Sequence, residues 1–571
     1  MTADEPEPLQ LHPEWYQHVI DQSTGKPLPP ELVAKAREEE MGFVRKMKIW
    51  EYDAVENCLA KSGRQPIPMG WVDINKGDDE HPKVRCRLVV QETRRQTTID
   101  PENTAAVFSA TPPYEAMRMI ISMLMTPRTP EEHDHVLTFI DISRAHPHAP
   151  MRRDLWVKLP PEDPRSGEPG ICGRLLKCMY GAKDAGQNFE LYTHDFMVSR
   201  EFQVGLFTPC VFHSEKKNQQ VYVYGDNFVV KGSRSENQHF VADLKTEMLA
   251  NVEGVLGPDP TQGDEQEVVC LNKIFRYVRG QTGNPDGATI EIEADPRHAD
   301  IIIQSLGLAS ASKAVVTPGL KQKVDAAADT PLPANEAQAY RSLTMRAAYI
   351  AEDRPDLKFA TKELARSMQC PTSGSWEALK RLGRYLLGTP RLIQRMERQP
   401  PQTTCVAYSD SDHAGCLRTR KSTSGTILMH GKHMVKMLST TQTPIALSSA
   451  ESEWYAGVRS ASALLGFQAL ASDLGRELTA RLALDATAAK GIAARRGVGK
   501  IRHLETQTLW LQRHVTNKRL SVEKVLGELN PADLGTKHVE RATLTRLLEI
   551  IAFSPRAGRS KIALQTTRLE P

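Results

Sequence analysis

Four acidic residues in the last third of the chain have the types and settings from which a two-metal hydrolytic site can be built. They are Asp410 after an apolar run in AYSDSDHAG, Glu453 near the start of a helical segment in LSSAESEWYAG, Asp485 at the end of the run LALD, and Asp533 in GELNPADLGTKH. Carboxylate oxygens are hard ligands that suit Mg²⁺. A phosphodiesterase needs two such ions, one to activate water and one to hold the leaving oxygen. Because a single acid is usually a solvated surface residue, the prediction rests on the four together.

A second candidate lies upstream in VYVYGDNFVV, residues 221–230, where alternating apolar residues run into Gly-Asp-Asn and out again. This pattern predicts two short strands joined by a tight turn. Asp226 lies at the tip and Asn227 follows it. Gly-Asp-Asn is also ordinary turn chemistry, so these ten residues alone do not indicate catalysis.

Five segments are expected to position these residues. We predict a poorly ordered, Pro/Glu-rich lead-in (1–40), a mixed α+β unit (41–275), a helical unit (276–400), an α/β unit that opens with strands and contains a long helix (401–545), and a C-terminal tail (546–571). Ser448 or Ser449 is a suitable N-cap for the long helix.

Length and composition narrow the class of protein. A chain of 571 residues exceeds what one hydrophobic core usually supports, and it contains no apolar run of the length that spans a membrane. The nine scattered cysteines fit reduced intracellular thiols better than disulfides or a zinc site. Net charge is +3, but residues 486–520 are strongly basic, with Glu505 as the one acid. That stretch could follow a phosphate backbone or form a solvated helix face.

The C-terminal unit resembles the RNase H domain of copia-type LTR retrotransposon polyproteins. The resemblance is carried in order by YSDSDHAG, RKSTSG, SSAESEWYAG, DATAA, KIRHLE and ADLGTK. It implies a catalytic, metal-binding tetrad of Asp410, Glu453, Asp485 and Asp533. Glu451 points to the other side of its helix, and Glu453 matches the acid-x-x-Ala pattern of RNase H helices. Glu505 competes with Asp533 for the fourth place, and His503 is either a proton-shuttling or a structural residue.

The upstream half resembles the reverse transcriptase of the same family. KVRCRLVVQE implies that Arg85 and Arg87 hold the incoming triphosphate, and TFIDISRAHPHAP implies a catalytic, metal-binding Asp141. The ring of His146 takes the place of the aromatic residue that excludes the ribose 2′-OH. The other implied nucleotide- and template-binding residues are Tyr180, Gly181 and Lys183 in LKCMYGAKDAGQNFE, and Tyr224 in the hairpin, where Asp226 is the second metal ligand.

Over residues 38–545 the resemblance implies a right-hand polymerase with fingers, palm and thumb, a helical connection and an RNase H-like domain. The implied activities are RNA-directed DNA synthesis and hydrolysis of RNA in RNA–DNA hybrids, with two Mg²⁺ at each active site. The implied partners are an RNA template, a DNA primer, RNA–DNA hybrid, dNTPs and other retrotransposon polyprotein products, with no membrane. We expect an intracellular, cytoplasmic protein with later nuclear entry, either a piece of a polyprotein or a truncated copy. The oligomeric state stays open.

Asn227 departs from the family pattern, which has a second Asp at this position. Asn keeps an oxygen ligand but removes one negative charge from a site built around two dications. Pro147 and Gly186–Gln187–Asn188 depart from the pattern as well. We therefore expect polymerase activity to be weakened or lost while the RNase H acids are complete. The alternatives are an enzyme with RNase H activity only and a non-catalytic remnant that binds nucleic acid.

Overall fold

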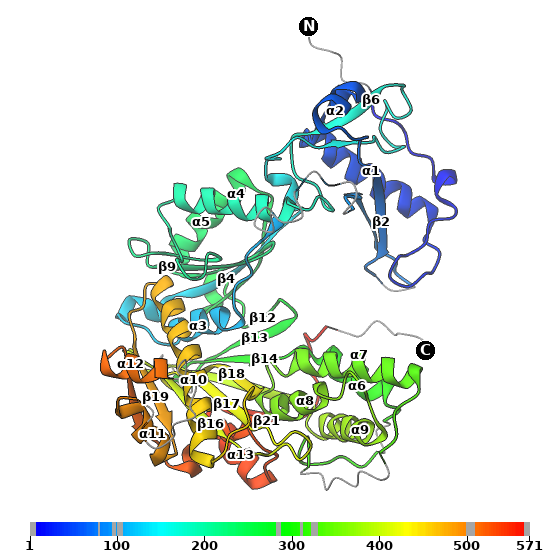
Figure 1. The fold of residues 1–571 in the computed structure, drawn as a ribbon. Helices are drawn as coiled ribbons and strands as arrows, with labels where there is room; N and C mark the ends of the chain where they lie inside the picture. The colour runs from blue at the N-terminus through cyan, green and yellow to red at the C-terminus, as the bar shows by residue number, and fades with distance from the viewer. Residues whose placement is uncertain are drawn as a thin grey trace.

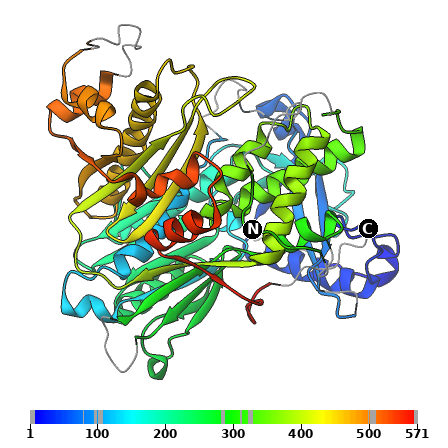
Figure 2. The ribbon, with the colours of Figure 1, turned by 90° about the horizontal axis from the view of Figure 1, so that it is seen from below.

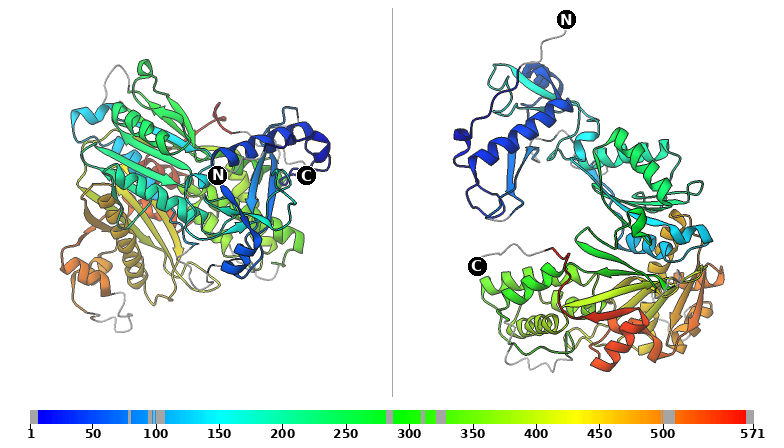
Figure 3. Two further views of the ribbon diagram at one scale, coloured as in Figure 1. Left: turned by 90° about the horizontal axis from the view of Figure 1, so that it is seen from above. Right: turned by 180° about the vertical axis from the view of Figure 1, so that it is seen from behind.

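The computed structural model describes residues 7–77, 80–93, 97, 99, 107–280, 287–308, 312–320, 329–497, 499 and 509–564. The N-terminal elements stand at one end of the molecule and helices α6, α7, α8 and α9 at another, with a central sheet joining them (Figure 1). The same open arrangement is visible from behind (Figure 3). Among the described residues, no helix combines the length and apolar character needed to cross a lipid bilayer.

Two small antiparallel sheets and two helices form the N-terminal region. Their elements are α1 (Pro30–Lys46), β1 (Trp50–Ala54), α2 (Val55–Ser62), β2 (Met69–Asn75), β3 (Val84–Val90), β5 (Trp156–Val157) and β6 (Ile171–Leu175). β2 pairs with β3, and β6 lies between β1 and β5. We refer to this region as the fingers.

The expectation of a poorly ordered lead-in over residues 1–40 is wrong where α1 begins. Val33 on this helix is fully buried. The guanidinium of Arg37 donates to Asp73 and to Glu162, each at 2.8 Å. Amino-acid composition does not reveal this helix, because Arg37 interrupts the apolar stripe of α1. The two carboxylates that make burial of Arg37 favourable come from distant segments.

The central sheet has six strands. In sheet order they are β11 (Ala250–Leu256), β4 (Val136–Ile142), β10 (Asn227–Gly232), β9 (Gln219–Tyr224), β8 (Val211–Ser214) and β7 (Gln203–Val204). The helices in this part of the chain are α3 (Tyr114–Leu124), α4 (Ala185–Ser199) and α5 (Arg234–Glu247). The hairpin predicted at 221–230 is confirmed as β9 and β10, which are antiparallel neighbours.

A five-stranded sheet and four helices follow the central six-stranded sheet, which we refer to as the palm. The strands in order are β12 (Glu267–Cys270), β13 (Lys273–Val278), β14 (Thr289–Glu293), β15 (Arg391–Glu397) and β21 (Phe553–Arg556), and the helices are α6 (Pro296–Ser305), α7 (Ala334–Ile350), α8 (Lys358–Ala365) and α9 (Ser373–Gly388). The boundary expected at residue 275 falls inside β13. The expected tail instead contributes the end of α13 (Arg541–Ile550) and all of β21, which pairs with β15. So short a strand, paired with a partner far away in the sequence, leaves no local signal.

The last unit is an α/β layer with strand order β18-β17-β16-β19-β20. Its elements are β16 (Thr404–Ser411), β17 (Thr423–His430), β18 (His433–Thr441), α10 (Ser449–Asp473), β19 (Thr479–Leu484), α11 (Thr487–Ala494), α12 (Trp510–Thr516) and β20 (Leu520–Lys524). α10 lies against this sheet on the side that faces the palm (Figures 1 and 2). Phe139 of the palm and Phe467 of α10 belong to one buried apolar cluster, so the palm and this unit share a core.

Candidate active sites

Three of the four C-terminal acids converge where two parallel strands end. β16 and β19 are adjacent and parallel, with Ser409 opposite Leu484, so Asp410 and Asp485 leave the sheet at the same edge. Glu453 reaches them from the second turn of α10. One carboxylate oxygen from each of Asp410, Glu453 and Asp485 lies within 4.8 Å of the others. The sequence placed these residues in separate segments, and the strand order brings them together.

Asp533 stands beside this trio rather than within it. It lies in the short helix η11 (Pro531–Gly535), and its Oδ1 is 2.9 Å from Nζ of Lys537. The neighbouring Thr536 donates its hydroxyl hydrogen bond to Oδ2 of Asp410. η11 therefore supports Asp410 and also presents a fourth carboxylate next to it. The competing Glu505, together with His503, lies outside the described residues.

The carboxylates of the trio lie close enough together to repel one another. Burial, followed by the charges of Asp410 and Asp485, raises the pKa of Glu453 to about 9. Burial and the charge of Asp410 also raise the pKa of Asp485, and they raise that of Asp533 to about 7. The backbone N–H of Ser411 donates to Oε1 of Glu453 at 3.2 Å. Within the described part of the chain, Oε2 of Glu453 is buried without any hydrogen-bond donor.

Glu451, the alternative to Glu453, is engaged in holding the start of α10. Its carboxylate accepts from the N–H of Leu447 at 2.9 Å and from the hydroxyl of Tyr455 at 3.0 Å. Its own N–H donates to the side chain of Ser448, the N-cap. The helix thus gives the two glutamates separate roles, one local and one at the acid cluster.

The palm acids meet through strand register. Asp141, near the end of β4, is directly opposite Asn227, the first residue of β10. Asp226 lies in the turn just before it, and its carbonyl accepts from the N–H of Ile142 at 2.9 Å, which fixes the turn against β4. Burial, followed by the charge of Asp226, raises the pKa of Asp141. The side-chain amide of Asn227 donates to Oδ1 of Asp226 at 2.8 Å.

Aromatic and basic side chains lie next to these acids. The ring centroids of His146 and Tyr180 are 4.8 Å apart, and the guanidinium of Arg87 lies 5.9 Å from the Tyr180 ring centroid. Burial raises the pKa of Tyr180, the charge of Arg87 lowers it and that of Asp226 raises it. The Tyr180 side chain therefore lies where the fingers and palm meet. Arg85 is exposed on β3.

The remaining predicted nucleotide-site residues have local structural roles. Gly181 has φ +88°, and a Cβ there would lie 2.0 Å from the carbonyl oxygen of Val90. The N–H of Lys183 donates to Glu92 at 2.9 Å. Tyr224 is 44% exposed at the end of β9. Gly181 thus lets the segment pass directly against β3.

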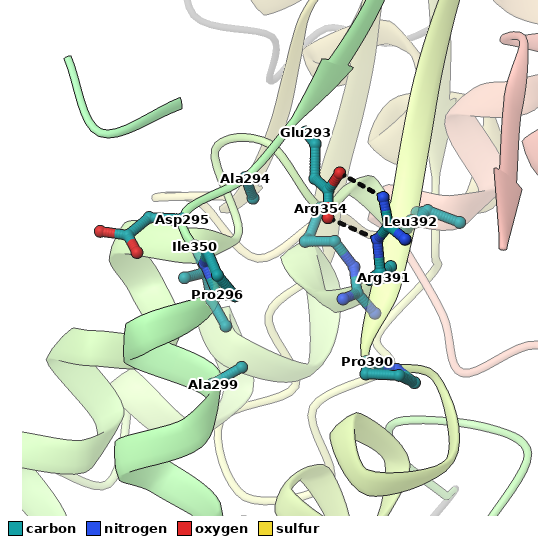
Figure 4. Close-up of a pocket in the computed structure, with 10 residues that line it drawn as sticks. All are labelled: Glu293, Ala294, Asp295, Pro296, Ala299, Ile350, Arg354, Pro390, Arg391 and Leu392. Carbon is teal, nitrogen blue, oxygen red and sulfur yellow. Dashed lines mark hydrogen bonds and ion pairs between the residues drawn. The ribbon is translucent and has the colours of Figure 1, made fainter. Parts of the chain in front are cut away.

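Two residues near the C-terminal acids were missed at the level of sequence. Lys537 pairs with Asp533, and the side chain of Asn530 donates to the carbonyl of Ser409, just before Asp410, at 2.9 Å. Lys537 is the last residue of the ADLGTK segment and Asn530 lies two residues before it, so the motif itself was the available signal. By contrast, the pocket in Figure 4, where Glu293 and Arg391 form an ion pair, has none of the predicted site residues in its lining.

Comparison with known proteins agrees with this layout. Residues 51–255 match the family described as reverse transcriptase (RNA-dependent DNA polymerase). The chain is 24% identical over 539 residues to the Retrovirus-related Pol polyprotein from transposon TNT 1-94 of Nicotiana tabacum, which covers 91% of this chain and 38% of that protein. It is 23% identical over 499 residues to the corresponding polyprotein from transposon RE2 of Arabidopsis thaliana, over 86% of this chain and 32% of that protein. The chain thus spans well under half the length of these curated relatives.

A solved structure of a foamy viral protease-reverse transcriptase in complex with dsDNA has a similar fold. The TM-score is 0.50 at 10% sequence identity, over 92% of this chain and 87% of that chain. The expected fold class is confirmed: a right-hand polymerase followed by an RNase H-like domain. Residues 51–255 thus match a reverse transcriptase family, and most of the chain is similar to Pol polyproteins from plant transposons.

Proposed function

We propose that the chain hydrolyses RNA in RNA–DNA hybrids with its C-terminal acids and extends a DNA primer on an RNA template with its palm acids. Polymerisation is weakened by Asn227. The observation that carries the proposal is the convergence of Asp410, Glu453 and Asp485 at one sheet edge, in a chain whose palm holds a separate Asp141–Asp226 pair.

The C-terminal acids fit a divalent cation. A buried oxygen of Glu453 without a donor, beside two further carboxylates, is a position that a cation would satisfy. An all-oxygen donor set favours Mg²⁺ over softer metals, and we propose two such ions at each active site. When bound, Mg²⁺ would activate water and neutralise charge on the scissile phosphate.

The chain's own residues divide the remaining work of RNA hydrolysis. Asp410, Glu453 and Asp485 would hold the cations, and the hydroxyl of Thr536 orients Asp410. Asp533 has a pKa of about 7, so its carboxyl group can take up or release a proton beside Asp410 near neutral pH. Lys537, paired with Asp533, supplies the positive charge that keeps this acid in place.

In the palm, Asp141 and Asp226 would hold the cations, which would neutralise charge on the dNTP triphosphate. Arg85 and Arg87 would contact the phosphates, and the tilted ring pair of His146 and Tyr180 would lie against the sugar. A third carboxylate at position 227 would add charge where the cations bind. Asn227 instead donates to Asp226, which occupies one of the oxygens that a cation would use.

That hydrogen bond favours a second candidate function, RNA hydrolysis without DNA synthesis. In this case the fingers, palm and thumb serve as a clamp for the hybrid. For either function, we propose that the partners are an RNA template, a DNA primer, their hybrid, dNTPs and other products of the same polyprotein. The proposed location is the cytoplasm with later nuclear entry.

The test is cleavage of end-labelled RNA in a hybrid with Mg²⁺, comparing the parent chain with Asp410→Asn and with Glu451→Gln as the matched control. We expect Asp410→Asn to abolish cleavage and Glu451→Gln to retain it. Primer extension with dNTPs, compared with Asp226→Asn, tests the palm. Failure of the parent chain to cut any hybrid would contradict the hydrolytic assignment. Cleavage without extension would select the second candidate function.

A further inference from the structure

Glu253 is placed beside the palm acids by an irregularity in strand pairing. Along β11, Asn251 is opposite Asp141 and Val252 is opposite Ile140, but the next paired residue is Gly254, opposite Phe139. Glu253 is therefore the extra residue of a β-bulge. A bulge disrupts the ladder locally and redirects a side chain, and bulges are frequent next to active sites.

The charged groups that face Glu253 are acids. Burial raises the pKa of Glu253, and the charges of Asp141 on β4 and Asp226 in the β9–β10 turn raise it further. Cys270 on β12 is the other titratable neighbour, since the charge of Glu253 acts on its thiol. No described residue donates a hydrogen bond to the Glu253 carboxylate or forms an ion pair with it. The charges of Asp141 and Asp226 thus act on the Glu253 carboxylate, and no described cationic side chain is among the groups that shift its pKa.

We propose that Glu253 is a third acidic ligand of the palm's divalent-cation site and supplies the negative charge that Asn227 lacks. This inference rests on the polymerase function proposed above. Asp141 and Asp226 together contribute two negative charges, and Glu253 restores the total to three from a different strand. The site takes a hard divalent cation, Mg²⁺ or Mn²⁺, through carboxylate oxygens.

The reach of Glu253 is compatible with this role. Among the described residues, the one group of three acids whose carboxylate oxygens lie within 4.8 Å of one another is the C-terminal trio. The carboxylates of Asp141, Asp226 and Glu253 are therefore spaced more widely than those of the trio. Glu253 as a whole residue is exposed on β11 although its carboxylate is partly desolvated, and its long side chain has several rotamers, so it can turn toward Asp141 without displacing the core. The competing explanation is that Glu253 is a solvated charge that protects the edge strand β11 from pairing with other chains.

Mn²⁺ binding to the full chain separates these explanations. In an Asp410→Asn/Asp485→Asn background, which removes the C-terminal site, free Mn²⁺ is counted by electron paramagnetic resonance. We expect Glu253→Gln to weaken Mn²⁺ binding about tenfold. Replacing a residue that supports a metal site typically lowers metal affinity by about 10–100-fold, and this expectation is at the lower end of that range. Adding Asn227→Asp to Glu253→Gln should restore the affinity. Glu265→Gln, which replaces an exposed acid whose carboxylate lies beside Gly254 of β11, is the matched control and should bind as the background does.

Each outcome decides a different point. Unchanged Mn²⁺ affinity in Glu253→Gln, while Asp141→Asn abolishes binding, overturns the role of Glu253 and leaves the polymerase proposal intact. Unchanged affinity in Asp141→Asn overturns the palm site itself. Weaker binding in Glu253→Gln that Asn227→Asp fails to restore shows a structural effect and also overturns the inference. Thermal unfolding of each variant confirms that the fold is kept.

Discussion

Proton release on Mg²⁺ binding is a quantitative consequence of the C-terminal acid cluster. Glu453, with a pKa of about 9, carries a proton at pH 7.5 in the metal-free chain. A carboxyl group must lose that proton before it can ligate a cation. At pH 7.5, deprotonating Glu453 costs about 2 kcal/mol. Mg²⁺ affinity at this pH should therefore be about thirtyfold lower than at pH values above 9. We therefore expect Mg²⁺ affinity to rise about tenfold per pH unit between pH 7 and 9.

The assay is isothermal titration calorimetry in an Asp141→Asn/Asp226→Asn background, repeated in buffers with different ionisation enthalpies. At pH 7.5 we expect about one proton from Glu453 and about a quarter of a proton from Asp533, whose pKa is about 7. Glu453→Gln should lose the larger part of this release. An Mg²⁺ affinity that is flat from pH 7 to 9, with no proton released, would refute the electrostatic account.

The same group makes metal-free stability depend on pH. Between its unfolded pKa of 4.5 and its folded pKa of about 9, Glu453 is protonated in the folded chain and ionised in the unfolded one. The unfolded state then binds fewer protons, so the free energy of unfolding falls by about 1.4 kcal/mol per pH unit across that window. Saturating Mg²⁺ should flatten this slope, and Glu453→Gln should remove its contribution without metal.

Other variants test separate parts of the structure. Asn227→Asp should speed primer extension at least about tenfold. The reason is that a unit charge about 4 Å from a cation is worth about 4 kcal/mol at a dielectric of about 20. An unchanged single-turnover rate of extension would contradict this prediction. Gly181→Ala should lower the free energy of unfolding by about 1–2 kcal/mol from its left-handed φ alone. It should also raise KM for dNTPs, because the segment around Gly181 must move away from Val90. An unchanged melting temperature together with an unchanged KM would contradict this prediction. Glu451→Ala should lower stability by about 1 kcal/mol through the α10 cap yet retain hybrid cleavage, in contrast to Glu453→Gln.

Local pattern was enough to predict the parts of the structure that depend on neighbouring residues. Alternation around Gly-Asp-Asn predicted the β9–β10 hairpin, and strand–helix context predicted that separated acids would meet at one place. Parallel pairing of β16 and β19 accounts for that meeting, because it brings Asp410 and Asp485 to one edge. The acid-x-x-Ala pattern of RNase H helices then distinguished Glu453 from Glu451, and the contacts of Glu451 with Leu447 and Tyr455 give the physical reason.

The remaining features depend on pairings between distant segments. Burial of α1 requires Arg37 to meet Asp73 and Glu162, which are 36 and 125 residues away in the sequence. The pairing of β21 with β15 closes a sheet across more than 150 residues of intervening chain. Glu253 reaches the palm acids through a one-residue irregularity in register, and periodicity cannot reveal such a shift.

The most direct test of two separate active sites in this chain is one Mg²⁺ reaction on a DNA primer annealed to a longer RNA template, with both strands labelled. The parent chain, Asp410→Asn, Asn227→Asp and the double variant are compared. We predict that RNA cleavage is lost whenever Asp410 is replaced and that primer extension rises whenever Asn227 is replaced, independently of each other. Extension that fails in every variant, or RNA cleavage that survives Asp410→Asn, would contradict the account.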